Sequence, residues 1–116
     1  MPRYLNLFAY TPEALASLCD DPQDRTAAVR EFSEARGGKL LAFYHMGGGV
    51  EYHGFSITEE PDDKTAEAAG WAVEAAGHLK QFKSYEIFTP EEMMESLRKA
   101  GGEALRTPTG GSDGSS

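Results

Sequence analysis

A chain of 116 residues with 40% hydrophobic residues is long enough for one domain with a modest core. Its formal net charge of −8 argues against sequence-independent binding to nucleic acid or anionic lipid, because clustered Lys and Arg attract both partners. Cys19 is the single cysteine, which rules out an intrachain disulfide and fits a reducing compartment. No apolar run approaches the roughly 20 residues of a membrane-crossing helix, and the start of the chain leads into a strand rather than a signal peptide. We therefore expect a cytoplasmic protein.

The spacing of apolar residues predicts the type of each element along the chain. Residues 4–10 alternate between two fairly apolar sets, which is typical of a strand with two half-buried faces. Thr11, Asp62 or Asp63, and Thr89 are suited to cap the helices that start after them. The expected ranges are a strand at 4–10, a helical region at 12–36 with a break near Pro22, strands at 40–45 and 52–58, a helix at 63–77, a strand at 81–88 and a helix at 90–100.

The order strand, helix, strand, strand, helix, strand predicts an α+β, ferredoxin-like βαββαβ fold with a four-stranded antiparallel sheet. Two right-handed crossovers place the first and third strands centrally, the second and fourth at the edges, and both long helices on one face. Residues 1–100 form this single domain. Residues 101–116 are rich in Gly, Ser, Thr and Pro, which predicts a disordered tail.

One face of such a sheet has no helix over it, and its composition predicts association. If the aliphatic residues of the strands face the helices, the bare face carries the aromatic residues Tyr4, Phe8, Tyr10, Phe82 and Phe88. An apolar patch of this size is too large for a monomer in water. We therefore expect a homodimer or higher homo-oligomer that forms through the sheet. Trp71 projects away from the small-residue stripe of its helix, to pack either under the C-terminal segment or against a partner subunit.

The stretch 44–53 brings chemically active side chains to one glycine-rich hairpin. If the ladder closes over the glycines without a bulge, His45 pairs with Glu51 and Phe43 with His53. His45, Glu51 and His53 then share a patch that could hold a divalent transition metal such as Zn, Fe(II) or Cu, with open positions for a substrate. The same residues, with Tyr52, could instead act as acid–base catalysts without metal, since a histidine beside a carboxylate exchanges protons near neutral pH. A third interpretation is that they are solvated hairpin residues.

Strand alternation predicts a second set of candidates. If Leu5, Leu7, Phe55 and Ile57 face the helices, His53 faces them too, unless a bulge at Gly47–Gly49 or Gly54 reverses it. The side chains that then face away from the helices, into the space between two associated sheets, are phenols, small polar groups and one carboxylate: Tyr4, Asn6, Tyr44, Tyr52, Ser56 and Glu86. Such a pocket suits the binding of an aromatic or polyketide-like substrate, although buried tyrosines more often only satisfy hydrogen bonds.

Several short motifs resemble the GYD domain family. They are Met1-Pro2-Arg3-Tyr4-Leu5, Tyr10-Thr11-Pro12-Glu13-Ala14, Asp24-Arg25-Thr26, Gly37-Gly38-Lys39-Leu40, Glu59-Glu60-Pro61-Asp62-Asp63 and Thr89-Pro90-Glu91-Glu92. The resemblance covers residues 1 to about 100 and implies a small ferredoxin-like protein related to the dimeric α+β barrels, in which two sheets face each other. Where the family's naming Gly-Tyr-Asp stands, this chain has Glu51-Tyr52-His53.

The resemblance leaves the activity open, because relatives among the dimeric barrels include cofactor-free monooxygenases, decarboxylases, cyclases, haem enzymes and plain ligand binders. We predict a small homodimeric barrel enzyme that acts on a small organic molecule. Its hairpin residues serve as acid–base groups or metal ligands. The alternative is a non-catalytic ligand-binding or assembly module, whose sheet serves only to oligomerise.

Overall fold

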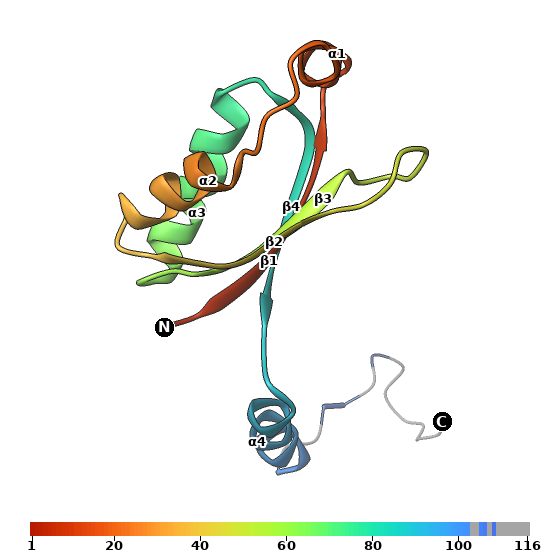
Figure 1. Cartoon of the computed structure of the whole chain (residues 1–116). Helices are drawn as coiled ribbons and strands as arrows, with labels where there is room; N and C mark the ends of the chain where they lie inside the picture. The colour runs from red at the N-terminus through yellow and green to blue at the C-terminus, as the bar shows by residue number, and fades with distance from the viewer. Residues whose placement is uncertain (103–104, 107, 109–116) are drawn as a thin grey trace.

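The computed structural model describes residues 1–102, 105–106 and 108, and Figure 1 shows their arrangement. The elements are β1 (Arg3–Tyr10), α1 (Pro12–Asp20), α2 (Thr26–Glu34), β2 (Lys39–His45), β3 (Gly54–Glu59), α3 (Asp63–Ala75), β4 (Leu79–Ile87) and α4 (Pro90–Gly101). Residues 103–104, 107 and 109–116 of the predicted disordered tail lie outside the described residues. No helix within the described ranges is long and apolar enough to cross a membrane.

The four strands form one antiparallel sheet in the order β2-β3-β1-β4, so the predicted fold and the central positions of the first and third strands are confirmed. β1 and β3 pair Leu5 with Ile57 and Leu7 with Phe55. The ladder between β2 and β3 has a bulge at Leu41, because Leu40 pairs with Thr58 and Ala42 with Ile57. The bulge shifts the rest of β2 by one residue, which decides the side on which each later side chain lies.

The helices start where the sequence predicts. The side chains of Thr11, Asp62 and Thr89 accept hydrogen bonds from backbone N–H groups in the first turns of α1, α3 and α4. The expected break near Pro22 separates α1 from α2, and Asp24 accepts the backbone N–H of Thr26 at 2.9 Å just inside α2. Each cap satisfies a donor that a helix leaves unpaired at its start.

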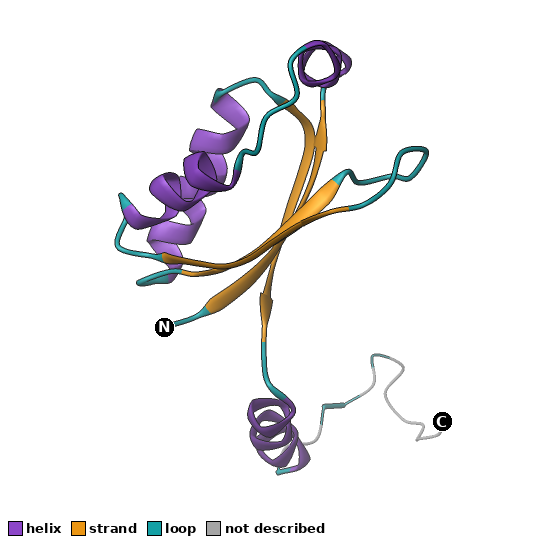
Figure 2. Ribbon diagram, in the orientation of Figure 1, coloured by secondary structure: helices purple, strands orange, loops and turns teal. Residues whose placement is uncertain are grey.

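The face of the sheet that the helices cover is the opposite of the one we predicted. α2 and α3 lie side by side over one face (Figure 2), and the cavity between them and the sheet is lined by Asn6, Phe8, Phe43 and Phe82. Alternation therefore turns Leu5, Leu7, Phe55 and Ile57 away from the helices. Both faces are apolar enough that alternation alone could not choose between them. The rings of Phe8 and Phe43 stack at 5.9 Å beneath the helices, where an aromatic layer excludes more water than the aliphatic set could.

We call the other side the open face, because none of the described helices lies over it in Figure 1 or Figure 2. Its side chains are aliphatic and aromatic at the centre and polar toward one edge: Leu5, Leu7, Ala42, Tyr44, Tyr52, Phe55, Ile57, Gln81, Lys83, Tyr85 and Ile87. Tyr44 is 61% exposed and Tyr85 51% exposed. A large part of the apolar surface of the sheet therefore faces water in the single chain.

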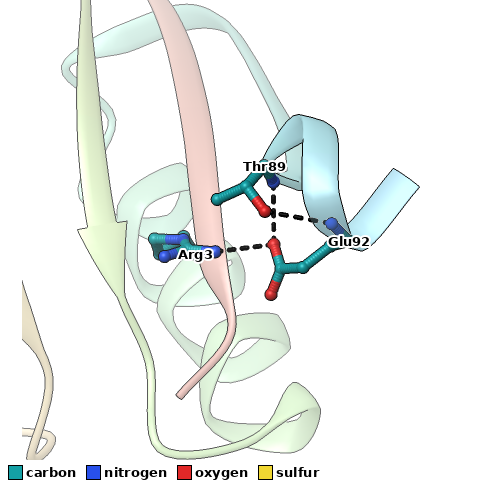
Figure 3. A network of polar contacts seen from close by, with 3 residues as sticks. All are labelled: Arg3, Thr89 and Glu92. Atoms are coloured by element: carbon teal, nitrogen blue, oxygen red, sulfur yellow. Dashed lines mark hydrogen bonds and ion pairs between the residues drawn. The ribbon is translucent and has the colours of Figure 1, made fainter. Parts of the chain in front are cut away.

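Helix α4 points away from the body of the protein. Thr89 and Glu92 form a capping box at its start, and Arg3 of β1 donates to Glu92 Oε1 at 2.8 Å (Figure 3). These bonds fix the direction in which α4 leaves the sheet. Its apolar side chains Met93 and Leu97 remain more than half exposed.

Candidate functional site

A cavity of about 300 Å³ lies between the helix-covered face of the sheet and helices α2 and α3. Its walls are mainly aromatic and aliphatic: Phe8, Phe32, Phe43, Val73, Leu79 and Phe82. α3 presents small side chains there, including Ala69, Ala72 and Ala76. The sequence pattern predicts that this small-residue stripe brings the helix close to the sheet. Gly70 of α3 does lie near the sheet, since a Cβ there would be 3.9 Å from the Phe82 ring, and the alanines leave space where the cavity lies.

Polar side chains cross the floor of the cavity in one hydrogen-bonded row. The amide nitrogen of Asn6 donates to Ser56 Oγ and to Thr58 Oγ1, each at 3.1 Å. Ser84 Oγ donates to Asn6 Oδ1 at 2.7 Å. Asn6, Ser56 and Thr58 are all buried. Asn6 was a predicted substrate-binding residue, and its amide is occupied in holding three strands together.

Glu60 lies at one end of this floor, just after β3. It is 6% exposed, and its Oε1 atom is buried with no hydrogen-bond partner among the described residues. Burial raises the pKa of the Glu60 carboxyl, and Thr58 and Arg36 only partly offset that effect. Gly38 lies against it, since a Cβ at that position would come within 3.3 Å of Oε1. The same Cβ would come closer still to the backbone oxygens of Glu59 and Ser33, so the close approach of the backbone requires glycine at this position.

Tyr10 lines the other end of the cavity, and His45 and His53 lie beside Tyr10. The backbone N–H of Tyr10 donates to His53 Nδ1 at 2.8 Å, and the two rings stack at 5.7 Å. An Nδ1 atom that accepts a hydrogen bond carries no proton, so His53 is the Nε2–H tautomer. The Tyr10 hydroxyl lies 3.5 Å from His45 Nε2. Burial raises the pKa of Tyr10, whereas the Arg25 guanidinium opposes the rise.

Tyr10 and Arg25 also line a second cavity, of about 340 Å³, between α1 and the loop that joins β2 to β3. His45, His53, Leu15 and Leu18 contribute to its walls. The two cavities therefore share Tyr10 and Arg25, and the hairpin histidines line only the second one. We call the junction at Tyr10 the entrance of the first cavity.

The predicted pairing of the hairpin is wrong. His45 pairs with Gly54, and Phe43 with Ser56, so residues 46–53 form a loop rather than the start of a strand. Gly54 occupies a place where a Cβ would come within 2.6 Å of the Phe8 ring, which explains why the ladder closes on a glycine. Glu51 is exposed in the loop. Across the described ranges, no three His, Cys, Asp or Glu side chains are close enough to hold a metal ion, so His45, Glu51 and His53 do not form the predicted triad.

The other predicted candidates are dispersed over both faces. Tyr44 stacks on Phe55 at 5.6 Å, and the Tyr52 hydroxyl accepts from Gln81, which pairs with Ala9 on the side away from the helices. Both tyrosines therefore lie outside the cavity.

Tyr4 and Glu86 pair across β1 and β4. The Tyr4 hydroxyl donates to Asp63 Oδ1 at 2.8 Å. Burial first, and this bond second, raise the pKa of Tyr4 to about 12, so it keeps its proton at neutral pH. Glu86 is exposed. Of the predicted set, only Asn6 and Ser56 line the first cavity, whereas His45 and His53 line the second.

The sequence analysis missed Glu60, Tyr10 and Arg25 as candidates. A signal for Glu60 exists, because Ser56, Thr58 and Glu60 continue one polar row at period two on the side of β3 that pairs with Asn6. Such a row on a covered face indicates a polar floor rather than a solvated surface. Tyr10 and Arg25 have no comparable signal, because the turn between α1 and α2 brings them together.

The model of the GYD domain matches residues 4–97, which is well over half of the chain. No curated protein matches the chain at a significant level.

Proposed function

The chain belongs to the GYD domain family, and from this premise we propose that it binds a small, largely apolar organic molecule in the cavity under α2 and α3. The observation that carries the proposal is the cavity itself, about 300 Å³ in volume with aromatic walls and a polar floor. Protein interiors normally leave few voids larger than a water molecule, whereas ligand sites are concave, mostly apolar and lined by a few polar groups.

We further propose that Tyr10 and His45 form an acid–base pair at the entrance. The Tyr10 hydroxyl oxygen and His45 Nε2 lie 3.5 Å apart, so a small closure of this distance would bring them within the roughly 2.6–3.2 Å over which a proton passes. The raised pKa of Tyr10 keeps its proton available for donation to a ligand, and His45 is the neighbouring acceptor. His53 supports this geometry by accepting the backbone N–H of Tyr10. If these residues transfer a proton to or from the ligand, the protein is an enzyme. If they do not, the cavity serves only to bind a ligand.

A second copy of the chain is the partner we propose for the open face. Leu7 and Phe55 pair at its centre with only partial burial. Two such faces packed together would bury apolar surface that water otherwise covers, which is favourable by about 25 cal/mol per Å². The exposed Met93 and Leu97 of α4, fixed in direction by the Arg3–Glu92 pair, add apolar surface beside this face. A dimer formed in this way leaves the cavities on the outer sides of the paired sheets.

Binding of 2-ethylnaphthalene, followed by its fluorescence, tests the cavity. Ala72→Phe fills the space from α3, so we expect the affinity for the probe to fall at least about tenfold. Ala68→Phe is the matched control, because Ala68 is an exposed residue of the same helix and does not line the cavity. Equal binding by Ala72→Phe and the wild type, or no binding by the wild type, would refute the proposal.

Proton transfer at the entrance is tested with 2-naphthol, whose excited state releases its proton to a nearby base. We expect naphtholate emission from the bound probe in the wild type and its loss in His45→Leu. His78→Leu is the control, since His78 also lines the cavity but does not contact Tyr10 in the described hydrogen bonds. If His45→Leu emits like the wild type, the acid–base pair is wrong and only ligand binding remains.

A further inference from the structure

Glu60 is a buried polar group of the cavity in which one carboxyl oxygen has no partner among the described residues. Its Oε1 atom has no hydrogen bond among the described residues, and the side chain is more than nine-tenths buried. A buried polar atom without a partner costs about 1–3 kcal/mol, more if the group is charged. The chain therefore tolerates a cost at this position, in a residue that lines the cavity.

The neighbours of Glu60 relieve that cost only in part. Both N–H groups of the Asn6 amide are used by Ser56 and Thr58. The ion pairs of the described residues are Arg3–Glu92 and Lys64–Glu67, so no cation forms a salt bridge with Glu60 among them. Burial of the carboxyl outweighs the opposing effects of the Thr58 hydroxyl and the Arg36 charge, and it favours the neutral form. A neutral carboxyl group is a hydrogen-bond donor as well as an acceptor.

We propose that Glu60, as a neutral acid, donates a hydrogen bond to the carbonyl or enolate oxygen of a small apolar ketone in the cavity. The inference rests on the proposed cavity function and adds the chemical class of the ligand. Walls of phenylalanine and alanine suit a ring or a hydrocarbon chain, and Glu60 supplies the polar contact that orients it.

The position of Glu60 also defines how such a ligand lies. Its backbone N–H donates to Pro2, just before β1, whereas Tyr10 ends the same strand. Glu60 and the Tyr10–His45 pair therefore mark opposite ends of the cavity. A ligand whose oxygen contacts Glu60 directs its remaining length along the floor toward the entrance. The recognition group and the acid–base pair are thus separate parts of one site.

A pair of probes that differ in one oxygen tests the inference: 2-acetylnaphthalene, which has a carbonyl, and 2-ethylnaphthalene, which has none. The measured quantity is the ratio of their affinities for the full-length wild type, Glu60→Gln and Glu60→Leu. We expect the ratio to fall about tenfold in Glu60→Leu, which cannot donate. Glu60→Gln keeps an N–H donor at the same position and should retain most of the preference. An unchanged ratio in Glu60→Leu would overturn the inference.

The infrared stretch of the probe carbonyl gives a second readout, which does not depend on affinity. A hydrogen bond lowers its frequency, so the bound ketone should absorb at lower frequency in the wild type and Glu60→Gln than in Glu60→Leu or in a hydrocarbon solvent. If Glu60→Leu does not fold, Glu60→Gln still tests the inference. Tighter binding of the ketone by Glu60→Gln than by the wild type would refute the neutral acid, because it would mean that the wild-type side chain is a carboxylate that repels the carbonyl oxygen. Normal binding of 2-ethylnaphthalene with no effect of Glu60 refutes this inference alone. Failure of both probes to bind the wild type refutes the cavity and this inference together.

Discussion

The two faces of the sheet are both apolar, but they differ in their polar residues and in their exposure. The helix-covered face buries the polar row of Asn6, Ser56 and Thr58 among aromatic walls, whereas the open face leaves Leu7 and Phe55 partly exposed to water. A single-chain protein is expected to cover its apolar surface and to leave polar side chains in solvent. The covered face is arranged around a cavity, and we propose that the open face packs against a second copy of the chain.

A charge at the centre of the open face should give the largest effect. In Phe55→Asp, a dimer formed through this face would bury one unpaired carboxylate from each copy, which is strongly unfavourable. We expect the dissociation constant of the dimer to rise about 100-fold, the equivalent of about 3 kcal/mol. Sedimentation velocity over a range of micromolar concentrations measures it.

Trp71→Asp is the control for that experiment. Trp71 is 68% exposed on α3, on the helical layer rather than on the open face. It should leave the dimer unchanged if the sheet is the interface. Dissociation by Trp71→Asp and not by Phe55→Asp would move the interface to the helices, and it would support the earlier alternative that Trp71 contacts a partner subunit. A wild type that is monomeric at every concentration measured would refute the proposed dimer.

A substitution in the polar floor of the covered face should give the second-largest effect, a loss of stability. Asn6→Leu removes three hydrogen bonds and leaves the hydroxyls of Ser56, Thr58 and Ser84 without their partner. Since each buried polar group left unpaired costs about 1–3 kcal/mol, we expect the free energy of unfolding to fall by about 3 kcal/mol. Urea denaturation followed by circular dichroism measures it.

Ser84→Ala is the matched change, because it removes only the bond to Asn6 Oδ1. It should lower the free energy of unfolding by about 1 kcal/mol. If Asn6→Leu were neutral, the covered face would tolerate an apolar floor, and the contrast between the faces would have no structural basis.

The sequence predicted the architecture because local signals agree with it. The caps at Thr11 and Thr89, the break near Pro22 and the order of elements all carry physical information within a few residues, and the match to residues 4–97 confirms the family resemblance. Which face of the sheet the helices cover could not be predicted in the same way. Leu5 and Phe8 are both apolar, so alternation defines two sets of residues but does not say which set the helices cover.

The candidate site was predicted only in part, because its geometry depends on the loop between β2 and β3. The bulge at Leu41 and the close contact of Gly54 with Phe8 set the ladder, and they place His45 beside Tyr10 rather than Glu51. Neither feature has a signature in the sequence. Glu60 was missed because Pro61, directly after it, indicated a strand end, where a carboxylate is usually solvated.

The smallest expected effect concerns the pH dependence of stability on the covered face. Burial raises the pKa of Glu60. The folded state then holds this proton more tightly than the unfolded chain, so the carboxyl lowers stability as pH rises from its ordinary range through the raised pKa. Tyr4, whose pKa is about 12, does not change charge in that window. Glu60→Gln has no proton to lose, and it should become more stable than the wild type as pH rises through this window.

Glu92→Gln gives the opposite sign and is therefore the control. Hydrogen bonding to the Thr89 backbone holds the pKa of Glu92 below its ordinary value, so its carboxylate adds stability above that value and the benefit is lost as pH falls through the lowered pKa. Relative to the wild type, Glu92→Gln should therefore lose stability as pH rises over the acidic range. Urea midpoints of the three proteins between about pH 3 and pH 8 measure both trends. Parallel curves for Glu60→Gln and the wild type would mean that Glu60 is solvated as a carboxylate, and the covered face would then contain no buried acid.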